Sequence, residues 1–238
     1  MAFDNDLNPL LEKCSDDDLA PLFYYIMENG DIAERLTDSF LYKEYFPKHS
    51  HYASVIADEI RLFGGDTFVN FFRRKGPAYK DIVMDVADKF KIRYNKNGSI
   101  DDIEFELLEG FVNYIWDRLA EEEKNVFVSN LNLRKEIAFE KVKNNLSDFL
   151  EDKDVLSKIF FIFSGIFGLE FNSKLENNKN KLMDFFNGIG IGNAIVSLSN
   201  PVGKIFNSLI STLYFSGPNF KVTVPSVLHI AALRRKYY

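Results

Sequence analysis

Apolar residues recur along most of this chain at the three- and four-residue spacing that is typical of amphipathic helices. The segments 51–63, 77–92 and 99–119 each place such residues on one helical face. Two capping boxes, Ser15–Asp18 and Ser99–Asp102, mark the start of helices, because both side chains of a box can accept otherwise unpaired backbone N–H groups. This pattern predicts an all-α protein.

The alternation of apolar and polar residues that indicates a β-strand is found in one short run, Phe220–Val224. Pro225 follows this run and suits the first turn of a last helix. Residues 154–171 are apolar on nearly every side, which predicts a helix at the centre of the fold. We therefore expect a compact multi-helix bundle with at most one short strand.

Residues 185–220 form an apolar stretch that carries a single charge, on Lys204. Pro201 divides this stretch, so we expect a hairpin of two helices, 185–199 and 202–216. A helix of that size is about 22 Å long, whereas the hydrocarbon core of a bilayer is roughly 30 Å thick. Two stable membrane spans are therefore not expected, and a hairpin within a soluble core is the main expectation.

Two glycine-containing motifs, Gly64-Gly65 before Asp66 and the run Gly188–Gly192, stand where glycine loops could bind phosphate groups. Neither follows a predicted strand, and neither contains the Gly-Lys-Ser/Thr of a nucleotide-binding loop. We expect the first to form a tight turn between helices. The small residues of the second favour close contact between helices. No cofactor site is predicted.

The organisation of the chain is not marked by repeats or by a Pro-rich or Gly/Ser-rich linker. We expect three parts. A short N-terminal helical leader covers residues 1–30, and a helical core covers residues 31–175. An apolar, acid-poor C-terminal hairpin with its tail covers residues 176–238 and packs on the core.

Charge is distributed unevenly along the chain, although the net charge is only −6. Residues 1–150 carry 29 acidic and 19 basic side chains, whereas residues 151–238 carry 6 acidic and 10 basic ones. No acidic side chain follows Asp184. This split indicates two regions with different surroundings, and the net acidity gives no reason to expect nucleic-acid binding.

Aromatic and cysteine contents add two expectations. The chain has 24 Phe and 11 Tyr beside one Trp, which predicts a core filled largely by phenyl rings. The single cysteine, Cys14, excludes an intramolecular disulfide and a multi-cysteine zinc site. Together with the lack of a secretory signal at the N-terminus, it favours a cytoplasmic location.

Several blocks of residues, spread over most of the chain, occur together in one protein family. They are Asp4–Leu7, Cys14–Leu19, Tyr42, Tyr45, Pro47, His49, Tyr52, Ile56-Ala57, Glu59, Phe63–Gly65, Asp85–Lys89, Tyr94–Lys96, Gly217-Pro218, Val222–Pro225, His229–Ala231 and Leu233-Arg234. As a set they resemble the YaaW-like family of uncharacterised bacterial proteins, which is grouped with ubiquinol–cytochrome c chaperone-type domains. The resemblance implies a helical fold with a short N-terminal leader domain, and it implies no established activity.

The residues around the histidines are the main candidates for chemistry. His49 and His51 stand two positions apart, so on a helix they point to different faces and do not form a metal-binding pair. We expect a loop-to-helix junction here, with Ser50 as the N-cap. If this region is catalytic, the hypothesis is an acid–base pair of His49 with Glu59 or Asp66. No metal site is predicted.

Three classes of function remain open. The leading one is a non-enzymatic, chaperone- or assembly-like interaction protein that holds a segment of a protein partner in an aromatic groove. The second is a protein that associates with or conditionally inserts into a membrane through residues 185–238, peripheral to the inner membrane. Its lipid-binding candidates are Lys204, Lys221, Arg234, Arg235 and Lys236. The third is an enzyme of unknown class.

Overall fold

The computed structural model describes residues 3–27, 34–64, 76–130, 153–171, 179–213 and 220–238. Within these ranges all regular structure is helical, in thirteen elements, and no strand is found. This confirms the all-α fold class.

Thirteen helical elements follow one another along the described part of the chain. They are α1 (Asn8–Leu11), α2 (Asp16–Met27), α3 (Glu34–Asp38), α4 (Phe40–Tyr45), the 3-10 helix η1 (His49–Tyr52), α5 (Ala53–Phe63), α7 (Tyr79–Lys89), α8 (Ile100–Trp116), α9 (Glu121–Asn130), α12 (Lys153–Phe171), α13 (Lys179–Gly188), α14 (Gly192–Leu213) and α15 (Phe220–Tyr237). Both predicted capping boxes are confirmed. In each, the serine hydroxyl accepts the aspartate N–H at 3.2 Å, and the aspartate carboxylate accepts the serine N–H in return.

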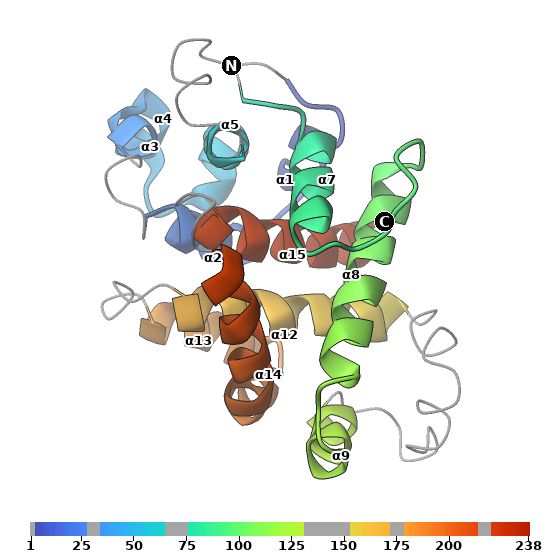
Figure 1. The fold of residues 1–238 in the computed structure, drawn as a ribbon. Coiled ribbons are helices and arrows are strands. Elements are labelled where there is room, and N and C mark those ends of the chain that lie inside the picture. The colour runs from blue at the N-terminus through green and yellow to red at the C-terminus, as the bar shows by residue number, and fades with distance from the viewer. Residues whose placement is uncertain (1–2, 28–33, 65–75, 131–152, 172–178, 214–219) are drawn as a thin grey trace.

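The last helix, α15, is at the centre of the molecule, and every residue from Val222 to Arg234 is buried. It packs along α12, whose side chains from Ile159 to Ile166 are buried where the structure describes them. Figure 1 shows α15 crossing the middle of the molecule, with α1, α5 and α7 on one side and α12, α13 and α14 on the other. The predicted central position of residues 154–171 is therefore correct, and α15 shares this position.

The predicted strand at Phe220–Val224 is wrong, because these residues form the first turns of α15. Val222, Thr223 and Val224 are all buried, so the alternation in the sequence did not reflect one buried and one exposed face. Pro225 lies inside the helix and does not begin it.

The predicted break at Pro201 is also wrong, because α14 continues through this residue. The hairpin turn lies earlier, at Gly190, which has a φ of +78°. The N–H of Ile191 donates to the carbonyl of Phe186 at 2.9 Å, and the N–H of Gly190 donates to that of Asn187 at 3.0 Å. These two bonds form a Schellman motif, in which a glycine in the left-handed conformation ends a helix.

The run Gly188–Gly192 therefore forms a turn, and the expected close helix contact is not its main role. A Cβ atom added at Gly188 or Gly190 would meet no atom within 4 Å. A Cβ atom at Gly192 would meet the side chain of Asn187 at the other end of the turn.

The N-terminal segment is joined to the C-terminal helix and to α7. The guanidinium of Arg234 donates to the carbonyl of Asp6 at 2.8 Å, and the N–H of Tyr79 donates to the carboxylate of Asp4 at 2.9 Å. The predicted boundaries near residues 30 and 175 stay predictions. No helix in the described ranges is both long and apolar enough to cross a bilayer.

Candidate partner-binding surface

Helix α4 lies at the surface, with Phe40, Lys43 and Glu44 exposed and its other residues half-buried. The hydroxyl of Ser39 caps it by accepting the N–H of Tyr42 at 3.1 Å, and none of its six residues is buried. Phe40, its first residue, has 75% of its side-chain surface exposed, and Phe46, just after its end, has 49% exposed. Two large apolar rings thus face solvent at the two ends of one short helix.

A cluster of rings lies beneath Phe46. Its centre is the buried Phe23 of α2, which stacks on Tyr42 with ring centroids 6.0 Å apart. Phe23 also contacts Phe46 at 5.8 Å, His49 at 4.8 Å and the buried Tyr52 at 6.4 Å. We call the exposed and half-buried residues Phe40, Tyr42, Tyr45 and Phe46 the aromatic surface, and Phe23, His49 and Tyr52 its base.

His49 is a buried part of this base. Its Nδ1 atom lies 2.5 Å from the hydroxyl of Tyr52. Burial lowers the pKa of His49, although the nearby carboxylates of Asp16 and Asp17 act in the opposite direction. The predicted N-cap role of Ser50 is wrong, because its backbone N–H donates to Asp16 at 2.7 Å and α5 begins three residues later, at Ala53. His49 is thus a neutral packing residue at pH 7.

Glu59 lies on α5 and is not joined to His49 by any hydrogen bond in the described part of the chain. Only 2% of Glu59 is exposed, and its Oε2 atom has no hydrogen-bond partner among the described residues. Burial raises the pKa of Glu59 to about 7. Asp66, the third residue of the catalytic hypothesis, lies outside the described residues. The three candidates are therefore not seen to form one site.

The basic residues of the tail are engaged inside the molecule. The Glu104 carboxylate accepts Arg234 Nε at 2.9 Å and Arg235 Nη1 at 2.6 Å, and the Asp18 carboxylate accepts Lys236 Nζ at 2.7 Å. Sequence reasoning did not identify Glu104 and Asp18 as their partners. The available signal was the lack of acidic residues after Asp184, which leaves the tail cations to pair with the acidic half of the chain.

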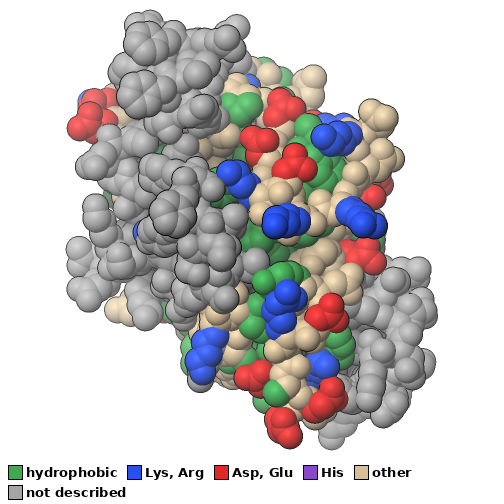
Figure 2. Space-filling view, viewed as in Figure 1, with side chains coloured by type: hydrophobic (Ala, Val, Ile, Leu, Met, Phe, Trp, Pro, Cys, Tyr) green, Lys and Arg blue, Asp and Glu red, His purple; other side chains and the backbone are tan. Residues whose placement is uncertain are grey.

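The two remaining lipid-binding candidates lie elsewhere. Lys204 is exposed on α14, and Lys221 is half-buried near the start of α15. Figure 2 shows Lys and Arg side chains interspersed with Asp and Glu on the face it presents. That face therefore carries mixed charge, which gives anionic lipid headgroups no uniformly positive surface to bind.

No protein-family model matches the chain, and no solved structure matches it. Curated relatives do match over nearly its full length. The UPF0174 protein YaaW of Escherichia coli strain K12 is 28% identical over 243 residues, covering 98% of this chain and 94% of the relative. A UPF0174 protein of Helicobacter pylori strain J99 is 26% identical over 246 residues, covering 98% and 92%. The chain is thus similar over nearly its full length to proteins of the UPF0174, or YaaW-like, family.

The core of the protein contains a polar chain around His229. The Nε2–H of His229 donates to the backbone carbonyl of Asp18 at 2.8 Å, which leaves Nδ1 as an acceptor 3.4 Å from the Ser164 hydroxyl. Tyr25 extends the chain with a hydroxyl 2.7 Å from Ser164 Oγ. All these groups are buried, so they are out of reach of a substrate. Their role is to satisfy one another's hydrogen-bonding capacity between α2, α12 and α15.

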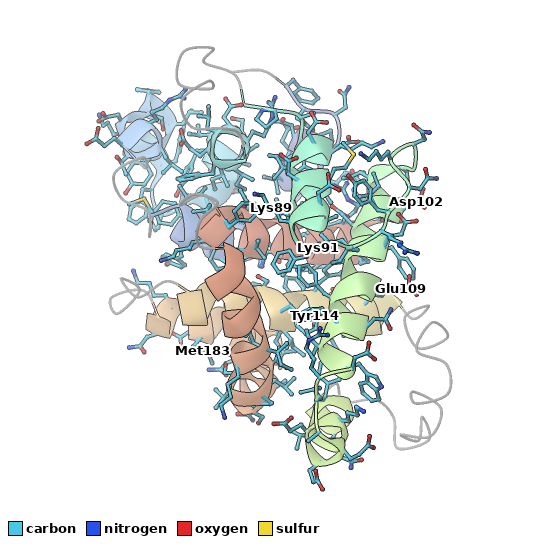
Figure 3. The ribbon with its side chains drawn as sticks, in the orientation of Figure 1. Lys89, Lys91, Asp102, Glu109, Tyr114 and Met183 are labelled. Atoms are coloured by element: carbon cyan, nitrogen blue, oxygen red, sulfur yellow. The ribbon has the colours of Figure 1, made fainter. Side chains whose placement is uncertain are left out.

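An acidic cleft of about 840 Å³ lies between α8 and the end of α15. Figure 3 shows Asp102 and Glu109 on the outer edge of α8, and both line this cleft. Asp102 is already used in a capping box, and the Glu106 carboxylate accepts the N–H of Asn95 at 2.7 Å. No group of three or more His, Cys, Asp or Glu residues in the described ranges is arranged to hold a metal ion.

Proposed function

We propose that this protein is a non-enzymatic interaction protein that binds an apolar segment of a protein partner on its aromatic surface. The observation that carries the proposal is the exposure of Phe46, which packs on Phe23 of an ordered ring cluster, together with the exposure of Phe40 at the start of α4. Exposure of these apolar rings to water is unfavourable, so covering them with a partner lowers the free energy. Each buried Phe side chain contributes about 1.5 to 3 kcal/mol relative to an exposed one.

The composition of the surface suits a protein interface. Aromatic residues are enriched at the centres of interfaces, where a few of them supply most of the binding free energy. Tyr42 and Tyr45 also carry hydroxyl groups that can bond to the backbone of a bound segment. A surface that holds an apolar segment in this way would serve a chaperone- or assembly-like role.

The base of the surface supports the proposal because it limits the entropy lost on binding. Phe23 and Tyr52 are buried, and Tyr42 and Phe46 are packed on Phe23 with centroids about 6 Å away. Side chains that are already ordered in the free protein lose little rotamer freedom when a partner covers them.

The experiment that tests this proposal is site-specific photocrosslinking followed by a binding measurement. A benzophenone amino acid replaces Phe40 in one variant and Val196 in another, because Val196 of α14 is also highly exposed, at 65%. We expect a discrete crosslinked protein from position 40 and not from position 196. That protein is identified by mass spectrometry, purified and titrated against the unmodified chain.

The titration is repeated with the double variant Phe40→Ser, Phe46→Ser and with the control Val196→Ser. We expect the double variant to bind at least about 100-fold more weakly, since two aromatic anchors are removed. The control should bind as the unmodified chain does. Equal affinity for the double variant and the control would show that the partner binds elsewhere.

A further inference from the structure

The buried carboxyl of Glu59 lies next to the element that positions the aromatic surface. Glu59 is on α5, and α3 packs against α5 with Leu36 buried. Only Ser39 separates α3 from α4. Because α4 has no buried side chain of its own, its position depends on α3 and on the ring cluster.

Among the described residues, no charged group is hydrogen-bonded to the Glu59 carboxyl so as to neutralise it when ionised. Arg35, on α3, is exposed and acts on Glu59 only through its charge, without a hydrogen bond. Asp58, beside it on α5, acts in the opposite direction. Arg61 is engaged by Asp4 at 3.6 Å and by Asp58 at 3.8 Å. His49 of η1 is neutral at and above pH 7 and adds no charge there.

An unpaired carboxylate is unstable at a site with this little solvent. Loss of the proton from Glu59 therefore requires either water or the Arg35 guanidinium to reach its oxygens. Glu59 is almost completely covered in the closed arrangement, so part of its cover has to move. The part we take to move is α3, because it packs on α5 and carries Arg35. The raised pKa of Glu59, about 7, means that this requirement arises within the physiological pH range.

We propose that deprotonation of Glu59 loosens the packing of α3 on α5 and thereby unlocks the aromatic surface of α4. The opening of α3 and α4 is a property of the free protein. Its consequence for a partner rests on the proposed function of the aromatic surface. The device makes partner binding sensitive to pH, with an ordered surface at pH 6 and a loosened one at pH 8.

Hydrogen–deuterium exchange of the free, full-length protein tests the opening. Peptides that cover residues 34–46 are followed at pH 6 and pH 8 in the unmodified chain and in Glu59→Gln, whose side chain has nearly the same shape and cannot ionise. At each pH, the exchange rate of the unmodified chain is divided by that of Glu59→Gln, which cancels the intrinsic effect of pH on exchange. We expect this ratio to rise about tenfold from pH 6 to pH 8, since the closed state holds the proton and the open state does not.

Two further variants make the result specific. Glu44→Gln changes an exposed carboxylate of α4 and should leave the pH dependence as in the unmodified chain. Arg35→Gln removes the cation that favours the ionised carboxylate, so its opening should require a higher pH. A circular dichroism spectrum matching that of the unmodified chain shows that each variant is folded.

If Glu59→Gln showed the same pH dependence as the unmodified chain, the ratio would not change with pH, and the inference would be overturned. Because exchange is measured without a partner, its result does not depend on the proposed function. The partner found by crosslinking is then titrated at both pH values. Equal affinity at pH 6 and pH 8, despite pH-dependent opening, would place the partner away from α4 and contradict the proposed function alone.

Discussion

Glu104 and Arg234 form an ion pair in the interior, with Arg234 Nε 2.9 Å from Glu104 Oε2. The same carboxylate oxygen accepts Arg235 at 2.6 Å, and the other oxygen accepts the hydroxyl of Tyr79 at 3.0 Å. Glu104 is fully buried. One carboxylate on α8 therefore holds the end of α15 and part of α7 together.

Replacing Glu104 with Leu should destabilise the protein strongly. The substitution leaves two guanidinium groups without their buried partner, and breaking a buried pair in this way costs about 3 to 5 kcal/mol. The free energy of unfolding, measured by urea denaturation at pH 7, should fall by that amount.

The matched control for this variant is Asp101→Asn. Asp101 pairs with the same Arg235 at 3.1 Å, but its side chain is 66% exposed. An exposed pair contributes at most about 1 kcal/mol. If both variants lost the same stability, the interior position of Glu104 would not be what matters.

The pairing of the tail with the first half of the chain explains what the charge pattern could and could not predict. The sequence has an acidic first part and an acid-free basic end, and we interpreted this split as two regions with different surroundings. In the structure the two face each other. Arg234 and Glu104 are 130 residues apart, and Lys236 and Asp18 are 218 apart. Local patterns carry no information on such distant pairs.

The helices were predictable for the opposite reason. Spacing and capping boxes act over three or four residues, so they are visible in the sequence wherever a helix has one exposed face. The start of α15 at Phe220 is buried on several sides, and its run of β-branched residues resembles a strand. For the candidate site, the sequence offered Tyr42, Tyr45 and Tyr52 only as positions of the family resemblance, and no local pattern joined them into one surface. The exposure of Phe40 depends on tertiary packing and was not predicted.

Stability should decrease between pH 7 and pH 4 because of His229. Burial lowers the pKa of His229 from 6.5 to about 4. In this range the unfolded chain binds a proton at this residue more readily than the folded one does, so acid favours unfolding. The loss attributable to His229 should reach about 3 kcal/mol at pH 4.

Urea denaturation at pH 7, 6, 5 and 4 checks this prediction in the unmodified chain and in His229→Gln. Carboxylates such as Asp18 titrate in both proteins, so the difference between the two curves isolates the imidazole. The difference should change across pH 6.5 to 4. A constant difference would mean that His229 takes up its proton without opening the core.

Phe23 and Phe40 should differ strongly in their contribution to stability, although both belong to the same group of rings. Phe23→Ala removes the buried ring at the base of the aromatic surface and should cost about 3 to 5 kcal/mol. Phe40→Ala removes a ring that faces solvent and should change stability by less than about 0.5 kcal/mol. Thermal unfolding of the two variants measures both values, and a large loss for Phe40→Ala would mean that its ring stabilises the fold and is not reserved for a partner.

The turn between α13 and α14 offers a matched pair of glycines. Gly190→Ala forces an L side chain into the left-handed region, at a φ of +78°, and should destabilise the protein by about 1 to 2 kcal/mol. Gly188→Ala adds a methyl group at the last residue of α13, where no atom lies within 4 Å. It should be neutral or stabilise by up to about 1 kcal/mol, since alanine favours helix and restricts the unfolded chain. Urea denaturation of both variants gives the sign of each effect. Equal losses would show that the space around the turn, rather than the backbone angle of Gly190, limits substitution.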